Sequence, residues 1–96
     1  MKEREIRRQI LDYLALCGVT AWLSHDERHR PAAPGVPDIL GVMRGTGRAV
    51  AIEVKRPGER ATEAQAMFAA RISEAGGLVL VATCVEDVKA KLYARR

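Results

Sequence analysis

A continuous run of apolar residues at positions 78–82, LVLVA, most constrains what this chain can fold into. Gly76-Gly77 precedes the run and Thr83 follows it, which predicts a short β-strand bounded by turn or cap residues. A strand without polar alternation is typical of a central strand that is covered on both faces. The rest of the chain is therefore expected to place helices on both sides of one sheet.

The N-terminal segment predicts a helix over residues 3–16, because its apolar residues recur at steps of three and four and Gly18 follows as a stop signal. Three strands should come next, over residues 19–24, 38–43 and 48–55. A polar loop with three prolines separates the first two strands. The glycine-rich turn Arg44-Gly45-Thr46-Gly47 predicts that the second and third strands form a hairpin.

Two capping boxes predict the remaining helices. Thr62 with Gln65 begins a helix that runs to Ala75, and Thr83 with Glu86 begins a terminal helix. A helix between the third and fourth strands should make that pair parallel. The expected fold is an α/β domain over residues 1–96, with the order α-β-β-β-α-β-α and a mixed central sheet flanked by helices.

The size and charge of the chain limit its functional classes. With 96 residues, 48% hydrophobic and 29% charged, it should form one soluble globular domain, which we expect in the cytoplasm without a membrane span or secretion signal. Cys17 and Cys84 lie far apart, so both should be reduced. The net charge of +4 is compatible with a polyanionic partner and equally with a solvated basic surface.

Three charged residues carry the strongest chemical signal. Side chains alternate along a strand, so Glu53 and Lys55 should share one face of the third strand, and Asp38 begins the strand expected to pair with it. The structural alternative is a salt bridge at a strand end. Two converging carboxylates with an ammonium group also suit a hard cation such as Mg²⁺, which phosphodiester hydrolysis can use to activate water.

These residues also carry a family resemblance. Pro37-Asp38 followed by Glu53-Val54-Lys55 resembles the signature of the PD-(D/E)XK, or restriction-endonuclease-like, nucleases. The wider pattern is similar to the VRR-NUC family of that superfamily and consists of GVPDI at 35–39, AIEVK at 51–55, Gln65 and Gly76-Gly77. It spans about nine-tenths of the chain.

The resemblance implies a DNA endonuclease that uses Mg²⁺ or Mn²⁺ and no organic cofactor. It implies a metal held by Asp38, Glu53, the Val54 carbonyl and a carboxylate of the first helix, for which we choose Glu5 over Glu3. It further implies that Lys55 lies near the attacking water and that Gln65 supports the site, although Gln65 could simply cap its helix. The family contains resolvase-like dimers, so we expect a homodimer that acts on branched DNA.

Other features are assigned less specific roles. His25 and His29 could form a zinc pair or supply a general base, but DNA contact together with Arg28 and Arg30 is the better interpretation. Trp22 and Phe68 could stack on bases, yet both lie on predicted apolar faces and are expected in the core. The rival function is a catalytically silent nucleic-acid-binding module, which would be expected to lack some of the three charged residues.

Overall fold

The computed structural model describes residues 1–24 and 33–93 and has the predicted order of elements, α-β-β-β-α-β-α. Its elements are α1 (Glu3–Leu16), β1 (Thr20–Leu23), β2 (Ile39–Val42), β3 (Ala49–Val54), α2 (Glu63–Glu74), β4 (Leu78–Ala82) and α3 (Val85–Lys91). The first three strands are each one residue shorter at both ends than predicted, and β4 has the predicted bounds. None of the described helices is long and apolar enough to cross a membrane.

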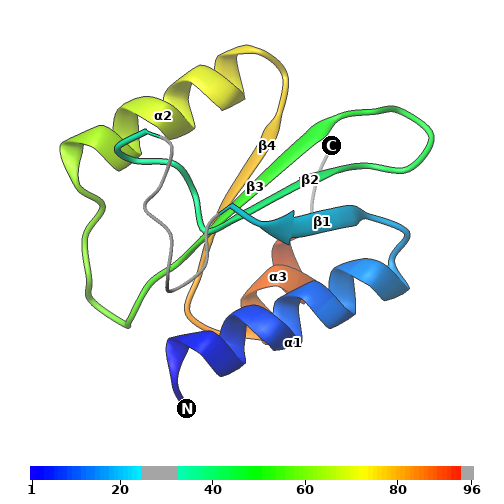
Figure 1. Cartoon of the computed structure of the whole chain (residues 1–96), viewed down its shortest axis with the longest axis horizontal. Coiled ribbons are helices and arrows are strands. Elements are labelled where there is room, and N and C mark those ends of the chain that lie inside the picture. Colours follow the sequence, from blue (N-terminus) through cyan, green and yellow to red (C-terminus); the bar gives the residue numbers. More distant parts are fainter. Residues whose placement is uncertain (25–32, 94–96) are drawn as a thin grey trace.

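The four strands form one mixed sheet in the order β1-β2-β3-β4. The first three are antiparallel neighbours, and β3 and β4 are parallel, as the helical connection between them predicts. Helices α1 and α3 pack on one side of the sheet, whereas α2 lies on the other side against β3 and β4 (Figure 1). The expected α/β fold, a mixed sheet flanked by helices, is confirmed.

The main core lies between the sheet and the α1–α3 pair. Alternate residues of β3 point into it, while the intervening residues of the strand face α2. The largest fully buried side chains all belong to this core: Ile10, Leu14, Ile39, Val50, Ile52 and Val88. Helix α2 contributes no fully buried residue, so the sheet face that it covers is the more open one.

Two local predictions are wrong. Strand β4 lies at the edge of the sheet rather than at its centre, and Val81 is 48% exposed, although the Lys91 ammonium group caps the edge by donating to the Val81 carbonyl. Thr83 and Glu86 form no capping box, because the Asp87 carboxylate accepts from both the Thr83 amide and its hydroxyl. Cys84 is the N-cap of α3 instead.

The prediction that Trp22 belongs to the core is also wrong. Trp22 is 47% exposed, and it is paired with Leu40 on the α2 side of the sheet. Helix α2 packs on β3 and β4, so it does not cover the part of this sheet face that β1 forms. Phe68 of α2 is partly buried.

Candidate active site

Asp38 and Glu53 meet where the β2–β3 pairing ends. Ile39 lies opposite Ile52, so the residue before Ile39 and the residue after Ile52 are brought together on adjacent strands. The Asp38 carboxylate accepts a hydrogen bond from the Val54 amide at 2.8 Å, and this bond fixes it beside the end of β3. Both carboxylates lie on the α2 side of the sheet, as the alternation of side chains requires.

Gly35 allows the segment that leads to Asp38 to pack closely against α2. Its φ of +83° is a conformation that glycine adopts without strain, and a Cβ atom there would lie 2.9 Å from the Gln65 amide nitrogen and overlap the Ala64 carbonyl. The loop therefore rests directly on the first turn of α2. Pro37, which is buried, then leads into Asp38.

Gln65 connects the charged residues of β3 to α2. Its Oε1 atom accepts from the Lys55 ammonium group at 2.7 Å, and its Nε2 atom donates to the Glu53 carboxylate at 2.9 Å. Gln65 also completes the predicted capping box, since Thr62 Oγ1 accepts from the Gln65 amide and Gln65 Oε1 accepts from the Thr62 amide. One side chain thus caps α2 and makes the contacts to Glu53 and Lys55 that a supporting role would require.

Lys55 is the single buried charged residue in the described part of the chain, with 7% of its surface exposed. Its ammonium nitrogen lies 4.0 Å from a Glu53 carboxylate oxygen and 3.9 Å from a Glu59 carboxylate oxygen. A buried ammonium group needs such partners, because an unpaired charge loses its hydration on burial. Contacts with three polar side chains hold its position.

Glu59 also contacts Lys55, although it was not predicted from the sequence to lie at the candidate site. It follows the Arg56-Pro57-Gly58 turn, accepts from the Arg56 amide at 2.9 Å and reaches Lys55. The signal in the sequence was a carboxylate three residues after the start of a Pro-Gly turn, a spacing at which a side chain can bond back to the backbone.

Burial and the proximity of Asp38 raise the pKa of Glu53 from 4.5 to about 7, in that order of importance. The Lys55 charge and a hydrogen bond from the Asp38 backbone act in the opposite direction, while Glu59 adds to the increase. Glu53 is only 14% exposed. A bound cation would favour the ionised form of Glu53 at this buried position beside Asp38.

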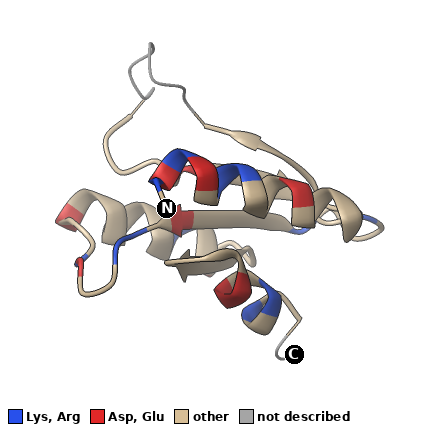
Figure 2. Cartoon of the chain, turned by 90° about the horizontal axis from the view of Figure 1, so that it is seen from below, with Lys and Arg blue, Asp and Glu red and all other residues tan. Residues whose placement is uncertain are grey.

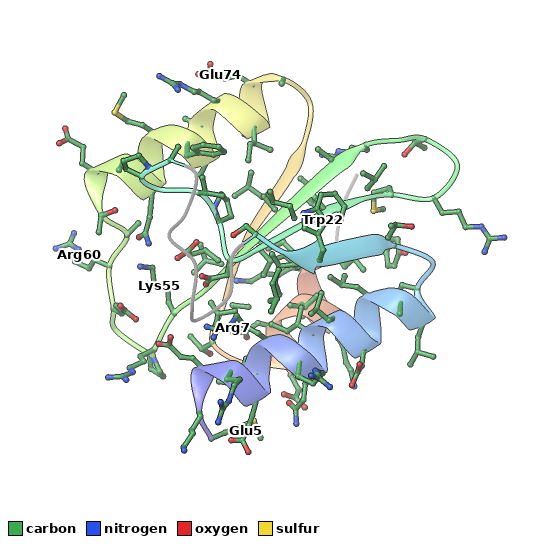
Figure 3. All side chains as sticks on the ribbon, in the orientation of Figure 1. Glu5, Arg7, Trp22, Lys55, Arg60 and Glu74 are labelled. Carbon is green, nitrogen blue, oxygen red and sulfur yellow. The ribbon has the colours of Figure 1, made fainter. Side chains whose placement is uncertain are left out.

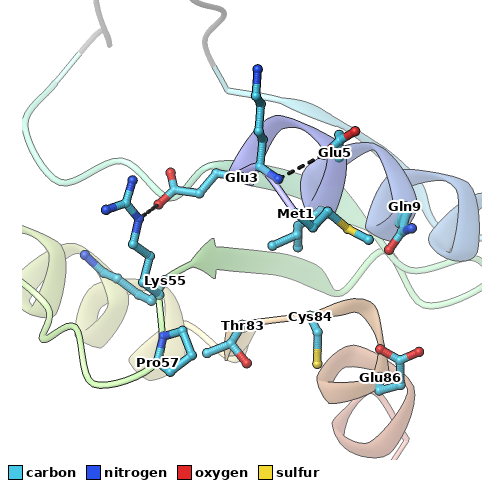
Figure 4. Close-up of a pocket in the computed structure, with 12 residues that line it drawn as sticks. Met1, Glu3, Glu5, Gln9, Lys55, Pro57, Thr83, Cys84 and Glu86 are labelled. Atoms are coloured by element: carbon cyan, nitrogen blue, oxygen red, sulfur yellow. Dashed lines mark hydrogen bonds and ion pairs between the residues drawn. The ribbon is translucent and has the colours of Figure 1, made fainter.

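The structure does not bring Glu5 together with Asp38 and Glu53. The Glu5 carboxylate accepts from the Lys2 backbone amide at 2.9 Å at the start of α1, and Figure 3 shows its side chain directed away from Lys55. Glu3, the alternative, lies 3.5 Å from the Arg56 guanidinium group and 3.8 Å from that of Arg7. In Figure 4, Glu3 lies on the Lys55 side of the helix start and Glu5 on the opposite side.

A groove of about 880 Å³ opens beside Lys55. It lies between the start of α1, the end of β3 and the start of α3 (Figure 4), and it is lined by residues that include Glu3, Lys55, Arg56, Pro57, Thr83 and Cys84. Helix α1 carries both basic and acidic residues (Figure 2), and Lys2, Glu3 and Glu5 at its start also line the groove. The groove thus carries both signs of charge.

The oxygen donors at the site fit a hard divalent cation, because Asp38 and Glu53 provide carboxylates and Val54 a backbone carbonyl at the same strand end. Within residues 1–24 and 33–93, no cluster of three or more His, Cys, Asp or Glu side chains is arranged to hold a metal. A cation here would complete its shell with the carbonyl and water. His25, His29, Arg28 and Arg30 lie outside the described residues.

Comparison with known proteins identifies the family. The family model of the VRR-NUC domain matches residues 1–86. This chain belongs to the VRR-NUC family. The VRR-NUC assignment confirms the predicted resemblance and makes the chain a member of a nuclease family whose enzymes generally use divalent metals.

Solved structures support the VRR-NUC fold. One, titled "VRR_NUC domain", has a TM-score of 0.72 and 19% identity, and the match covers 97% of each chain. Another, a "VRR_NUC domain protein", has a TM-score of 0.62 and 20% identity, and the match covers 96% of this chain and 85% of the other. No curated protein matches the sequence.

Proposed function

We propose that this VRR-NUC protein is an endonuclease that hydrolyses DNA phosphodiester bonds with Mg²⁺ or Mn²⁺. The observation that carries the proposal is the pair of carboxylates, Asp38 and Glu53, on adjacent strands with the buried Lys55 ammonium group 4.0 Å from Glu53. A salt bridge at a strand end would need only one carboxylate, whereas here Asp38 lies beside Glu53 and adds to the effect of burial in raising the pKa of Glu53.

The cation would be held by Asp38, Glu53 and the Val54 carbonyl, with a first-helix carboxylate as a further candidate. Glu3 suits that role better than Glu5, because Glu3 lies on the Lys55 side of the helix start and reaches Arg56, whereas Glu5 lies on the opposite side and accepts from the Lys2 amide (Figure 4). When bound, the metal lowers the pKa of a coordinated water and neutralises charge on the phosphate.

The protein's own groups would position the reaction. Lys55 can donate to the attacking water or to a phosphate oxygen on which negative charge develops. Gln65 and Glu59 hold the Lys55 ammonium group, so its position is fixed before substrate arrives. Gln65 also orients the Glu53 carboxylate.

DNA as the partner is supported by the family and by the net charge of +4. Lys and Arg contacts to phosphate release counterions, so binding should weaken steeply with salt, with a log-log slope of roughly 0.9 per contact. A flat response between low and moderate salt would argue against a DNA partner.

We further propose that the protein acts as a homodimer on branched DNA. A domain of 96 residues has room for one site, whereas two copies related by a two-fold axis can address two diverging strands. Light scattering gives the mass in solution. A monomer that cuts linear duplex as readily as four-way junctions would contradict this part of the proposal and leave the catalytic assignment standing.

The decisive assay offers linear, flapped, forked and four-way DNA to the pure protein with Mg²⁺, Mn²⁺ or EDTA. Cleavage with a metal and none with EDTA is the expected result. Tight DNA binding without cleavage under any metal would favour the silent binding module.

A further inference from the structure

Trp22 is unusually exposed for the largest apolar side chain of the molecule. It is the one tryptophan in the chain, and 47% of its surface is accessible although it lies in the middle of strand β1. A half-exposed indole on a sheet face loses favourable burial unless something else covers it. Figure 3 shows the side chain rising over the strands rather than toward α1.

The strand register places Trp22 on the same sheet face as the candidate active site. Trp22 lies opposite Leu40, and Leu40 lies opposite Ala51, so the three form one row across β1, β2 and β3. Two residues further toward the same end of the strands come Asp38 and Glu53. Strand spacing and rise per residue put the Cα atoms of Trp22 and Glu53 about 12 Å apart.

The surroundings of Trp22 are apolar and small. Val42, on the same face of β2, is 39% exposed. Leu40, which lies next to Val42 on β2 and opposite Trp22 on β1, is partly buried. The exposed part of these side chains amounts to roughly 200 Å², against about 800 Å² per partner in a stable protein interface. A second copy of the chain therefore finds too little apolar area here for a stable contact.

We propose that Trp22 stacks on an unpaired nucleobase next to the phosphate that is cut. The inference rests on the proposed function and deepens it, because it names an unstacked strand as the preferred substrate. A flat indole fits the face of any base, and in intact duplex those faces are hidden within the stack. The strand register places Trp22 and the candidate active site on the same sheet face, so one DNA strand can contact both.

Trp22 fluorescence tests this directly, because no other tryptophan contributes to the signal. The wild-type protein is titrated in EDTA, which prevents metal-dependent cleavage, with single-stranded DNA, with duplex containing an unpaired base and with fully paired duplex. Quenching by the first two and little change with the third is expected. Binding of single strands seen by anisotropy without any change in Trp22 emission would overturn the proposal.

Variants separate stacking from other roles. Trp22→Ala should weaken binding of single strands by about tenfold to a hundredfold, and Trp22→Phe should recover most of this loss. The salt slope should stay unchanged, because no phosphate contact is removed. Leu16→Ala is the matched control, since Leu16 is 86% exposed at the end of α1, which packs on the other side of the sheet.

Two results with the Trp22→Ala variant would also contradict the proposal. Equal affinity of Trp22→Ala and wild type for single strands would remove Trp22 from the DNA surface. A change of mass from dimer to monomer in Trp22→Ala would show that Trp22 contacts a second copy of the chain instead of DNA. Neither depends on catalysis, so failure of the nuclease assay and failure of this proposal are distinguishable.

Discussion

The Lys55 ammonium group donates to the side-chain oxygen of Gln65 at 2.7 Å, which ties the end of β3 to the first turn of α2. The same Gln65 oxygen accepts from the Thr62 amide. The start of α2 and the position of the Lys55 ammonium group therefore both depend on the side-chain amide of Gln65.

Two substitutions separate these roles. Thr62→Ala removes the hydroxyl that caps the Gln65 amide and should cost about 1 kcal/mol of unfolding free energy while cleavage is kept. Gln65→Ala also releases Lys55 and Glu53, so kcat should fall by roughly tenfold to a hundredfold. Urea unfolding and single-turnover cleavage measure the two effects. A loss of kcat in Thr62→Ala equal to that in Gln65→Ala would show that only helix capping matters.

Lys55→Met should lose about a hundredfold or more in cleavage rate and retain metal binding, because it removes a charge stabiliser and no ligand. The methionine keeps much of the side-chain volume at a position that is 7% exposed. Calorimetric titration at pH 8.5, where Glu53 is ionised, measures the affinity of the variant for the metal. Lost metal binding in this variant would contradict the role given to Lys55.

Glu53→Gln should stabilise the metal-free protein at neutral and alkaline pH. The pKa of Glu53 is raised from 4.5 in the unfolded chain to about 7, so its contribution to stability is full below pH 4.5 and is lost as the pH rises through 7. The difference between the two pKa values corresponds to at most about 3 kcal/mol. Glutamine cannot ionise and avoids this loss.

Urea unfolding in EDTA from pH 5 to pH 8.5 tests this prediction. The stability of the variant relative to wild type should increase across that range. A constant difference would mean that Glu53 ionises in the folded protein as it does in water.

Gly35→Ala should destabilise the site more than the matched change Gly45→Ala. Both glycines have φ above +80°, so both substitutions carry a strain of about 1 to 2 kcal/mol. Only at Gly35 would the added Cβ meet the α2 backbone, whereas nothing lies within 4 Å at Gly45. Cleavage should therefore fall in Gly35→Ala alone. Equal cleavage rates and equal stability of the two variants would contradict the close packing of Gly35 against the first turn of α2.

Much of the fold follows from local patterns. The alternation in β3 predicts that Glu53 and Lys55 share a face, and the glycine-rich turn at 44–47 predicts the hairpin that brings Asp38 beside them. The capping box at Thr62 predicts the start of α2. These features depend on residues that are near one another in the sequence.

The failed predictions depend on contacts distant in sequence or on competing partners. Whether β4 is central and whether Trp22 is covered are decided by the order of strands and the position of α2, which no local pattern encodes. Thr83 is not the N-cap of α3, because its amide and hydroxyl both donate to the Asp87 carboxylate. The cytoplasmic location, the homodimer and the preference for branched DNA stay predictions.

The measurement that tests the central claim most directly compares wild type with Asp38→Asn in a cleavage assay with Mn²⁺, with and without EDTA. Asparagine keeps an oxygen that can accept from the Val54 amide, so the fold should be preserved and only a charged ligand is removed. Wild type should cleave the DNA, EDTA should abolish this cleavage, and Asp38→Asn should not cleave. Equal cleavage by both proteins, or cleavage by wild type in EDTA, would contradict a metal site at Asp38.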